Sequence, residues 1–160
     1  MQHSLLLASL CALLAASAAS AQTPGQAAAD TPMPPVAPVW TPQDAGLQWG
    51  SCPPFMPEGC AIAVLHGDPA QPNADVFLKV PGGAVIPRHR HTSAERMVLV
   101  SGEMRVTYDG QQETVLHPGS YAYGPATLPH VGTCAAGEPC VLFIAFESPV
   151  DAMPVLPGGN

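Results

Sequence analysis

The stretch that decides the fold is Gly83–Gly102, GAVIPRHRHTSAERMVLVSG. Within it His89 and His91 are two residues apart, and Glu95 follows four residues later. Residues i and i+2 of an extended strand share a face, so the two imidazoles project side by side. Both can then reach one metal ion at about 2.1 Å. We therefore expect a metal site, with Glu95 adding an oxygen ligand from the start of the next strand.

A second stretch, Gly119–His130 (GSYAYGPATLPH), supplies His130 as a fourth candidate ligand. Three imidazoles and one carboxylate leave a divalent ion with a net charge of about +1 and, in octahedral geometry, about two open positions. This donor set is typical of a site that holds a metal and still accepts another molecule.

These two stretches resemble the two sequence motifs of the cupin family. The first matches the pattern G-x5-HxH-x3-E-x6-G at every fixed position, from Gly83 to Gly102. The second resembles G-x5-PxG-x2-H-x3-N at Gly119, Pro125 and His130, but has Thr127 in place of the glycine and Cys134 in place of the asparagine. A turn with positive φ at position 127 would suit glycine better.

The resemblance covers roughly residues 60 to 150. It implies an all-β fold, a single small antiparallel β-barrel or jelly roll, with one divalent transition metal held inside by His89, His91, Glu95 and His130. The resemblance favours Fe or Mn where redox chemistry is involved, whereas affinity order alone favours Cu or Zn outside the cytoplasm. Fe, Mn and Zn are the metals we expect.

For the function, the resemblance implies a metal-binding cupin. Our first hypothesis is an exported metal-dependent enzyme, dioxygenase-like or lyase-like, that acts on a small oxygen-bearing molecule. Two alternatives stay open, a non-catalytic periplasmic binder of metal or small ligand and a structural module. Beyond the four ligands, the sequence assigns no catalytic residue, and a fold that hosts many chemistries does not decide among them.

The N-terminus predicts export. An apolar run over residues 5–19 is followed by Ala19-Ser20-Ala21, which is typical of a signal peptide cleaved near Ala21. No other apolar run of about 18 residues follows, so no membrane-spanning segment is expected after cleavage. We expect a periplasmic or secreted protein.

Four cysteines remain after that cleavage, at positions 52, 60, 134 and 140. An even number in an exported protein favours disulfides over a thiolate metal site. Three connectivities are possible, and we favour the local pairs Cys52–Cys60 and Cys134–Cys140. The alternative makes Cys134 a functional thiol near the metal.

The predicted organisation is a signal peptide (1–21), a Pro/Ala-rich arm or linker (22–58), the barrel (59–150) and a C-terminal tail (151–160). Nine of the twenty prolines fall in the arm, which therefore cannot form a helix. From Trp40 onward the arm becomes aromatic and apolar, and we expect it to pack on the barrel rather than line a ligand entrance.

Beyond the arm, short apolar runs separated by turn residues predict strands at 61–66, 75–80, 84–91, 96–100, 104–108, 112–116, 121–123, 130–134 and 141–147. Asp109-Gly110 predicts a type I′ hairpin turn.

Alternation along residues 95–100 places Glu95, Met97 and Leu99 on one inward face, with Val98 and Val100 on the other. The apolar outward face indicates cover by the N-terminal arm or by a second subunit, so a homodimer is an expectation. The sequence has a net charge of −7 and lacks the basic patch that nucleic-acid binding needs, so we expect no nucleic-acid partner. A small-molecule ligand is the expected partner. His66 and His117 adjoin turns and are left out of the site.

Overall fold

The computed structural model describes residues 36–156, which consist of strands and loops. The predicted signal peptide and the first part of the arm lie outside the described residues. Within the described range no helix is long and apolar enough to cross a membrane. The strands in chain order are β1 (Trp49–Ser51), β2 (Ala61–His66), β3 (Asp75–Val80), β4 (Val85–Arg90), β5 (Glu95–Ser101), β6 (Met104–Tyr108), β7 (Thr114–Leu116), β8 (Tyr121–Gly124), β9 (His130–Cys134), β10 (Cys140–Phe146) and β11 (Met153–Pro154).

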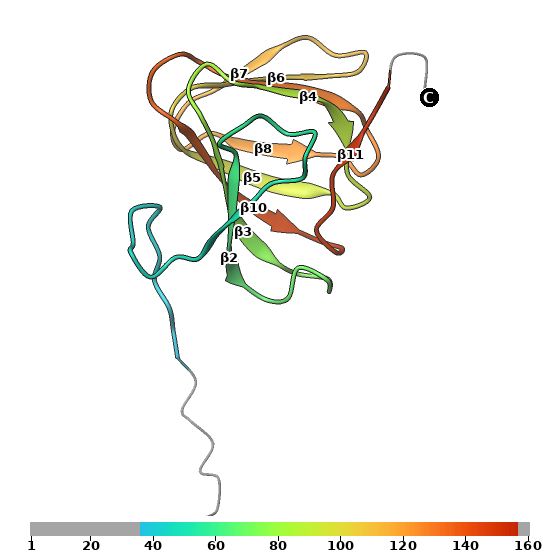
Figure 1. Ribbon diagram of the computed structural model, residues 1–160. Coiled ribbons are helices and arrows are strands. Elements are labelled where there is room, and N and C mark those ends of the chain that lie inside the picture. The colour runs from blue at the N-terminus through green and yellow to red at the C-terminus, as the bar shows by residue number, and fades with distance from the viewer. Residues whose placement is uncertain (1–35, 157–160) are drawn as a thin grey trace, which may run out of the picture. The chain divides into compact units, whose positions relative to one another are not determined.

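The strands form two antiparallel sheets that face each other (Figure 1). The first sheet has the order β1-β2-β3-β10-β5-β8, and the second has the order β11-β4-β9-β6-β7. The sheets do not close into a continuous barrel, because no strand of one sheet pairs with a strand of the other among the described residues. This is the all-β, jelly-roll-like architecture that the sequence predicts.

The hydrophobic core lies between the two sheets, and the period-2 pattern of β5 shows how it is built. Met97 and Leu99 are buried on the inner face, and Val100 is exposed on the outer face. The predicted inward face of this strand is therefore confirmed. From the second sheet, Met104 and Ile86 enter the same apolar cluster.

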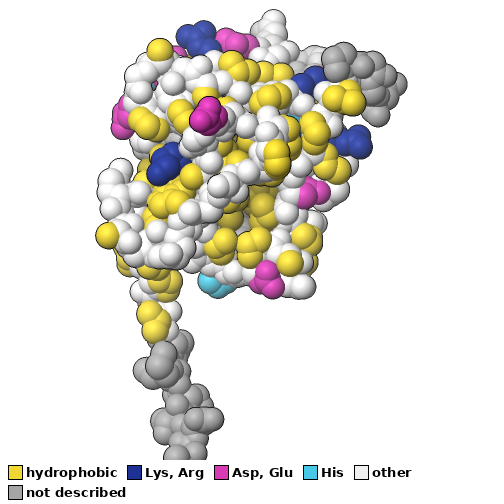
Figure 2. Space-filling view, in the orientation of Figure 1, with side chains coloured by type: hydrophobic (Ala, Val, Ile, Leu, Met, Phe, Trp, Pro, Cys, Tyr) yellow, Lys and Arg dark blue, Asp and Glu magenta, His cyan; other side chains and the backbone are white. Residues whose placement is uncertain are grey.

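The part of the arm from Leu47 onward packs on the outer face of the first sheet. Leu47 forms a separate apolar cluster with Phe77 of β3 and Val141 of β10, against which Trp49 also packs. The ammonium of Lys79 lies 4.1 Å from the Trp49 ring centroid. The arm thus covers the part of the outer face formed by β2, β3 and β10, but Val100 on β5 keeps 37% of its surface exposed. On the face drawn in Figure 2, hydrophobic side chains are widespread and charged ones are few.

Both local disulfides are present. Cys52 Sγ lies 2.07 Å from Cys60 Sγ, and Cys134 Sγ lies 2.05 Å from Cys140 Sγ. The second bond ties the end of β9 to the start of β10, which lie in different sheets. The alternative of a free Cys134 thiol near the metal is therefore wrong.

Two turns differ in how well the sequence predicts them. The prediction of a type I′ turn at Asp109-Gly110 is wrong. Such a turn needs positive φ at both residues, and only Gly110 has it (75°). The connection from β6 to β7 runs over residues 109–113, too long for a two-residue turn. At Thr127, by contrast, φ is +64°, the left-handed value for which glycine is better suited. Its amide donates a 2.8 Å hydrogen bond to the His91 carbonyl.

Replacing Thr127 with glycine should therefore stabilise the protein by about 1 kcal/mol, because a β-branched residue in the left-handed region is strained. Thr127 is exposed, so the change removes little packing. The free energy of unfolding in urea measures the effect. The matched control is Thr114→Gly, an exposed strand threonine with negative φ, which should lower stability. Destabilisation by Thr127→Gly would contradict the assignment of strain to this turn.

Candidate metal centre

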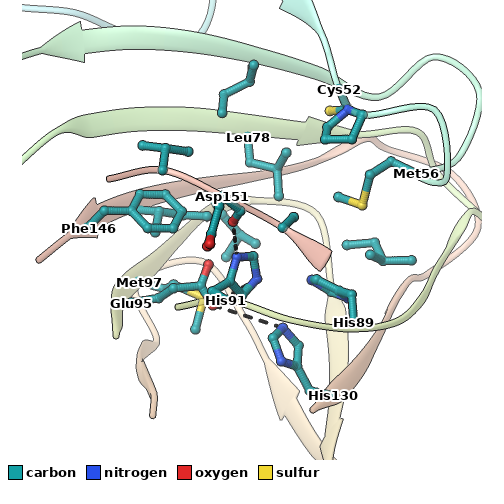
Figure 3. Close-up of a pocket in the computed structure, with 18 of the residues that line it drawn as sticks. Cys52, Met56, Leu78, His89, His91, Glu95, Met97, His130, Phe146 and Asp151 are labelled. Carbon is teal, nitrogen blue, oxygen red and sulfur yellow. Dashed lines mark hydrogen bonds and ion pairs between the residues drawn. The ribbon is translucent and has the colours of Figure 1, made fainter. Parts of the chain in front are cut away.

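The four predicted ligands come together in the cavity between the sheets (Figure 3). His89 lies on β4, Glu95 begins β5 and His130 begins β9, while His91 follows the end of β4. All four residues are at least nine-tenths buried, with exposed fractions between 3% and 8%. Strand pairing explains the meeting, since His89 of β4 lies directly opposite His130 of β9.

The three imidazoles are close enough to share one ion. One nitrogen from each of His89, His91 and His130 lies within 4.8 Å of the corresponding atoms of the other two. Glu95 Oε2 lies 3.4 Å from His91 Nε2 and 4.0 Å from His130 Nε2. The carboxylate therefore stands beside the three-histidine cluster, on the side of His91.

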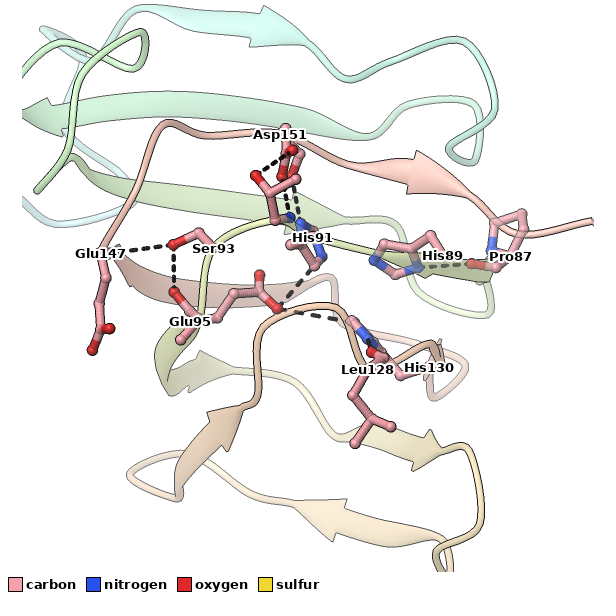
Figure 4. A network of polar contacts seen from close by, with 11 residues as sticks. Pro87, His89, His91, Ser93, Glu95, Leu128, His130, Glu147 and Asp151 are labelled. Atoms are coloured by element: carbon pink, nitrogen blue, oxygen red, sulfur yellow. Dashed lines mark hydrogen bonds and ion pairs between the residues drawn. The ribbon is translucent and has the colours of Figure 1, made fainter. Parts of the chain in front are cut away.

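Backbone carbonyls fix which nitrogen of each ring faces the cluster (Figure 4). His89 Nδ1 donates to the Pro87 carbonyl at 2.8 Å, and His130 Nδ1 donates to the Leu128 carbonyl at 3.3 Å. His91 Nδ1 donates to the carbonyl of Asp151. Because a carbonyl can only accept, each Nδ1 carries the hydrogen, and each Nε2 keeps a free lone pair. Metal-binding histidines are held in this way in proteins.

The electrostatics of the cluster favour neutral imidazoles. Burial, with the nearby His91, lowers the pKa of His89 from 6.5 to about 4. Burial, with His89 and His91, lowers the pKa of His130 to about 3. Burial raises the pKa of Glu95 above its ordinary value, although His91 opposes this shift. At neutral pH the lone pairs of His89 and His130 are therefore available to a metal ion.

The surroundings of His91 Nε2 show whether these residues fit a metal. This atom is buried and has no hydrogen-bond partner among residues 36–156. A buried polar atom without a partner costs about 1–3 kcal/mol, a cost that coordination to an ion would remove. The donor set of three imidazoles and one carboxylate suits a divalent transition metal. The residues present therefore fit a divalent transition metal.

The segment between His91 and Glu95 is held by residues that the sequence analysis missed. Thr92 donates to the Asp151 carboxylate twice, from its amide at 2.9 Å and from its hydroxyl at 2.6 Å. The buried Ser93 hydroxyl accepts from the amides of Glu147 and Ser148, each at 2.9 Å. Asp151 thus supports His91 both directly and through Thr92. The sequence around Asp151 contains no motif that predicts these contacts.

The cavity beside the cluster has a volume of about 280 Å³. Its walls include Met97, Leu142 and Phe146, together with Met56 from the arm, so the arm lines the cavity as well as packing on the sheet. Tyr108 of β6 also lines it, and its ring centroid lies 4.7 Å from that of His130. Alternation along β6 from the buried Met104 could have placed Tyr108 on this face.

Two histidines outside the predicted ligand set and the two tyrosines of β8 lie away from the cluster. His66 and His117 are exposed, and His117 lies near Glu103 on the surface. Tyr121 and Tyr123 keep 63% and 51% of their surface exposed. None of these four side chains lines the cavity that contains the cluster.

Comparison with known proteins gives the family context of this site. A family model described as a cupin domain matches residues 76–146, a range that contains the four clustered residues. Among curated proteins, none matches this chain in sequence.

Solved structures show the same fold. The DMSP lyase DddQ from Ruegeria pomeroyi DSS-3 is 20% identical, with a TM-score of 0.60 over 71% of this chain and 64% of that protein. An RmlC-like cupin protein from Ralstonia eutropha JMP134 is 25% identical, with a TM-score of 0.53 over 64% of each chain. The polyketide cyclase RemF from Streptomyces resistomycificus is 18% identical, with a TM-score of 0.59 over 71% of this chain and 84% of that protein. The chain thus spans less than two thirds of the DMSP lyase and of the Ralstonia protein.

The lowered pKa values of His89 and His130 predict an acid-sensitive metal-free protein. Between about pH 4 and 6.5 the unfolded chain binds protons at these positions and the folded chain does not, so stability falls as pH falls. Each histidine contributes up to about 1.4 kcal/mol per pH unit in this window. Urea unfolding of chelator-treated protein at several pH values measures the slope.

The matched comparison is the double variant His89→Gln, His130→Gln, which should show a shallower loss of stability on acidification. Glu95, with its raised pKa, acts in the opposite direction, but it is present in both proteins. Equal slopes for the two proteins would contradict the neutral state of the buried imidazoles.

Proposed function

We propose that this chain, a small single-domain cupin, is an exported protein that holds one divalent transition metal through His89, His91, Glu95 and His130 and presents it to a small oxygen-bearing molecule. The observation that carries the proposal is that one nitrogen from each of the three imidazoles lies within 4.8 Å of the other two, and that His91 Nε2 is buried without a hydrogen-bond partner among the described residues. A bound metal would act as a Lewis acid or redox centre for oxygen atoms of the ligand.

The residues of the chain have distinct parts in this proposal. The carbonyls of Pro87, Leu128 and Asp151 orient the three rings. Glu95 supplies a negative charge that offsets part of the metal's charge. Because Glu95 is buried, its attraction to the metal is weakly screened by solvent. The apolar walls lower the local dielectric constant around the centre, which strengthens the electrostatic interactions inside it.

The chemistry we favour is that of a metal-dependent oxidoreductase or lyase. Solved structures of this fold include DMSP lyases, a polyketide cyclase and an oxalate oxidase. At identities of 16–20% these likenesses show the fold alone, so the reaction of this chain is our inference from the site. For the metal we propose Fe, Mn or Zn, because the donor set combines imidazole nitrogen with a single carboxylate.

Export is supported by two observations. The two disulfides are compatible with an oxidising compartment such as the periplasm. The N-terminal apolar run followed by Ala19-Ser20-Ala21 is typical of a cleaved signal.

Elemental analysis of protein purified from periplasm, beside His91→Ala, tests the metal site. We expect about one metal ion per chain in the wild type, and at least a tenfold loss of affinity in the variant, because removing one ligand weakens the whole set. The thermal midpoint should rise on metal addition in the wild type and not in the variant, since only a bound ligand stabilises the folded state.

The matched control is His117→Ala, which removes an exposed histidine on the surface and should retain the metal. Unchanged metal content in His91→Ala, or equal loss in both variants, would contradict the site. A wild-type protein without metal, and without a thermal shift on metal addition, would refute the proposed function.

A further inference from the structure

The walls of the cavity carry few polar groups. Of the 24 residues that line it, six have polar or charged side chains: His89, His91, Glu95, Tyr108, His130 and Asp151. The rest are apolar side chains with one glycine. In Figure 3, Met97 and Phe146 lie to the left of the histidines, and Leu78 lies above them. A ligand in this cavity therefore meets polar atoms at one end only.

The cationic side chains of the protein lie outside the cavity. None of the described residues that line it is a lysine or an arginine. Four of the five cations in the sequence have partners elsewhere: Lys79 with the Trp49 ring, Arg88 with Asp109, Arg96 with Glu147, and Arg105 with Glu103 and Glu113. The fifth, Arg90, alternates with His89 and His91 and so faces away from the cluster.

This distribution of charge restricts the ligand. A carboxylate or phosphate away from the metal would lie in an apolar cavity without a cation to pair with it. Burying an unpaired charge is costly, so such a ligand would bind poorly. An oxygen-bearing end beside the metal meets no such penalty.

Two of the six polar side chains remain once the four clustered residues are set aside. The Asp151 carboxylate already accepts two hydrogen bonds from Thr92. The Tyr108 hydroxyl is buried and has no partner among residues 36–156. Tyr108 is therefore the one group in the described lining that has an unused hydrogen-bond donor.

The hydroxyl also lies close to the cluster. A Cβ added to Gly124 of β8 would lie 2.7 Å from Tyr108 Oη and 3.1 Å from Glu95 Oε2. The missing side chain of Gly124 thus leaves the space that the phenol and the carboxylate share. The Tyr108 ring, for its part, packs beside His130.

We propose that the cavity takes a small molecule with one oxygen-bearing end and an uncharged apolar remainder, and that the Tyr108 hydroxyl donates a hydrogen bond to an oxygen of that end. The inference rests on the proposed function, because the oxygen-bearing end is the end that meets the metal. It adds the class of ligand and a specificity-determining residue. Tyr108 acts on the ligand and is not a ligand of the metal.

A pair of probes with one chelating group separates this inference from metal binding. Benzohydroxamic acid has an apolar ring behind its chelating end, and 4-carboxybenzohydroxamic acid adds a charge at the far end of the ring. Zinc-loaded protein, with its zinc content measured first, is titrated with each probe by calorimetry. Because both probes chelate alike, the ratio of their dissociation constants reports the cavity walls and not the metal.

We expect the carboxylated probe to bind at least about tenfold more weakly, from the cost of an unpaired buried charge. Tyr108→Phe should weaken benzohydroxamate binding by about three- to tenfold, as for the loss of one hydrogen bond. Its zinc content should stay unchanged. The matched control is Tyr121→Phe, which removes an exposed hydroxyl and should change the dissociation constant by less than about twofold.

The outcomes distinguish the two proposals. Equal or tighter binding of the carboxylated probe to zinc-loaded protein would overturn the ligand class, and equal effects of Tyr108→Phe and Tyr121→Phe would overturn the role of Tyr108. A wild-type protein that takes up none of zinc, iron and manganese would refute the proposed function, and the inference with it. Gly124→Ala provides a second variant, whose methyl group enters the shared space and should weaken benzohydroxamate binding.

Discussion

The constraint on which the structure depends is the burial of three imidazoles and a carboxylate in one apolar cavity. Such groups cannot be left in this environment without partners. The protein satisfies them from outside by giving each Nδ1 a backbone carbonyl, and it leaves the inner nitrogens for an ion. The facing sheets and the described part of the arm line the cavity and bury this arrangement. Its stability and its proposed chemistry therefore have the same origin.

Much of this could be predicted from the sequence, because the decisive information is local. The spacing of His89, His91 and Glu95 encodes a strand and the turn after it. Alternation along β5 fixes which residues face inward. The cysteine pairs are six and eight residues apart, so their pairing also follows from short loops. Thr127 stands where the motif has glycine, and its positive φ is the value that the motif requires.

What the sequence did not predict depends on contacts between distant segments. Asp151 supports His91 across 60 residues, and Ser93 meets the amide of Glu147 across 54. β1 and β11 have three and two residues, too few for a periodic pattern. The prediction for Asp109-Gly110 was wrong because a dipeptide alone does not show how long the loop between β6 and β7 is. Alternation could have turned Tyr108 inward, but only the packing around it shows that its hydroxyl lacks a partner among the described residues.

The contact between Asp151 and His91 has a consequence for how the protein is made. A chain synthesised from its N-terminus contains all four proposed metal ligands once residue 130 has been added. The carbonyl that orients His91 and the carboxylate that holds Thr92 arrive only 21 residues later. A nascent chain therefore has the four proposed ligands before it has the residue that orients His91 and holds Thr92. The arrangement around His91 therefore requires a chain that extends at least as far as Asp151.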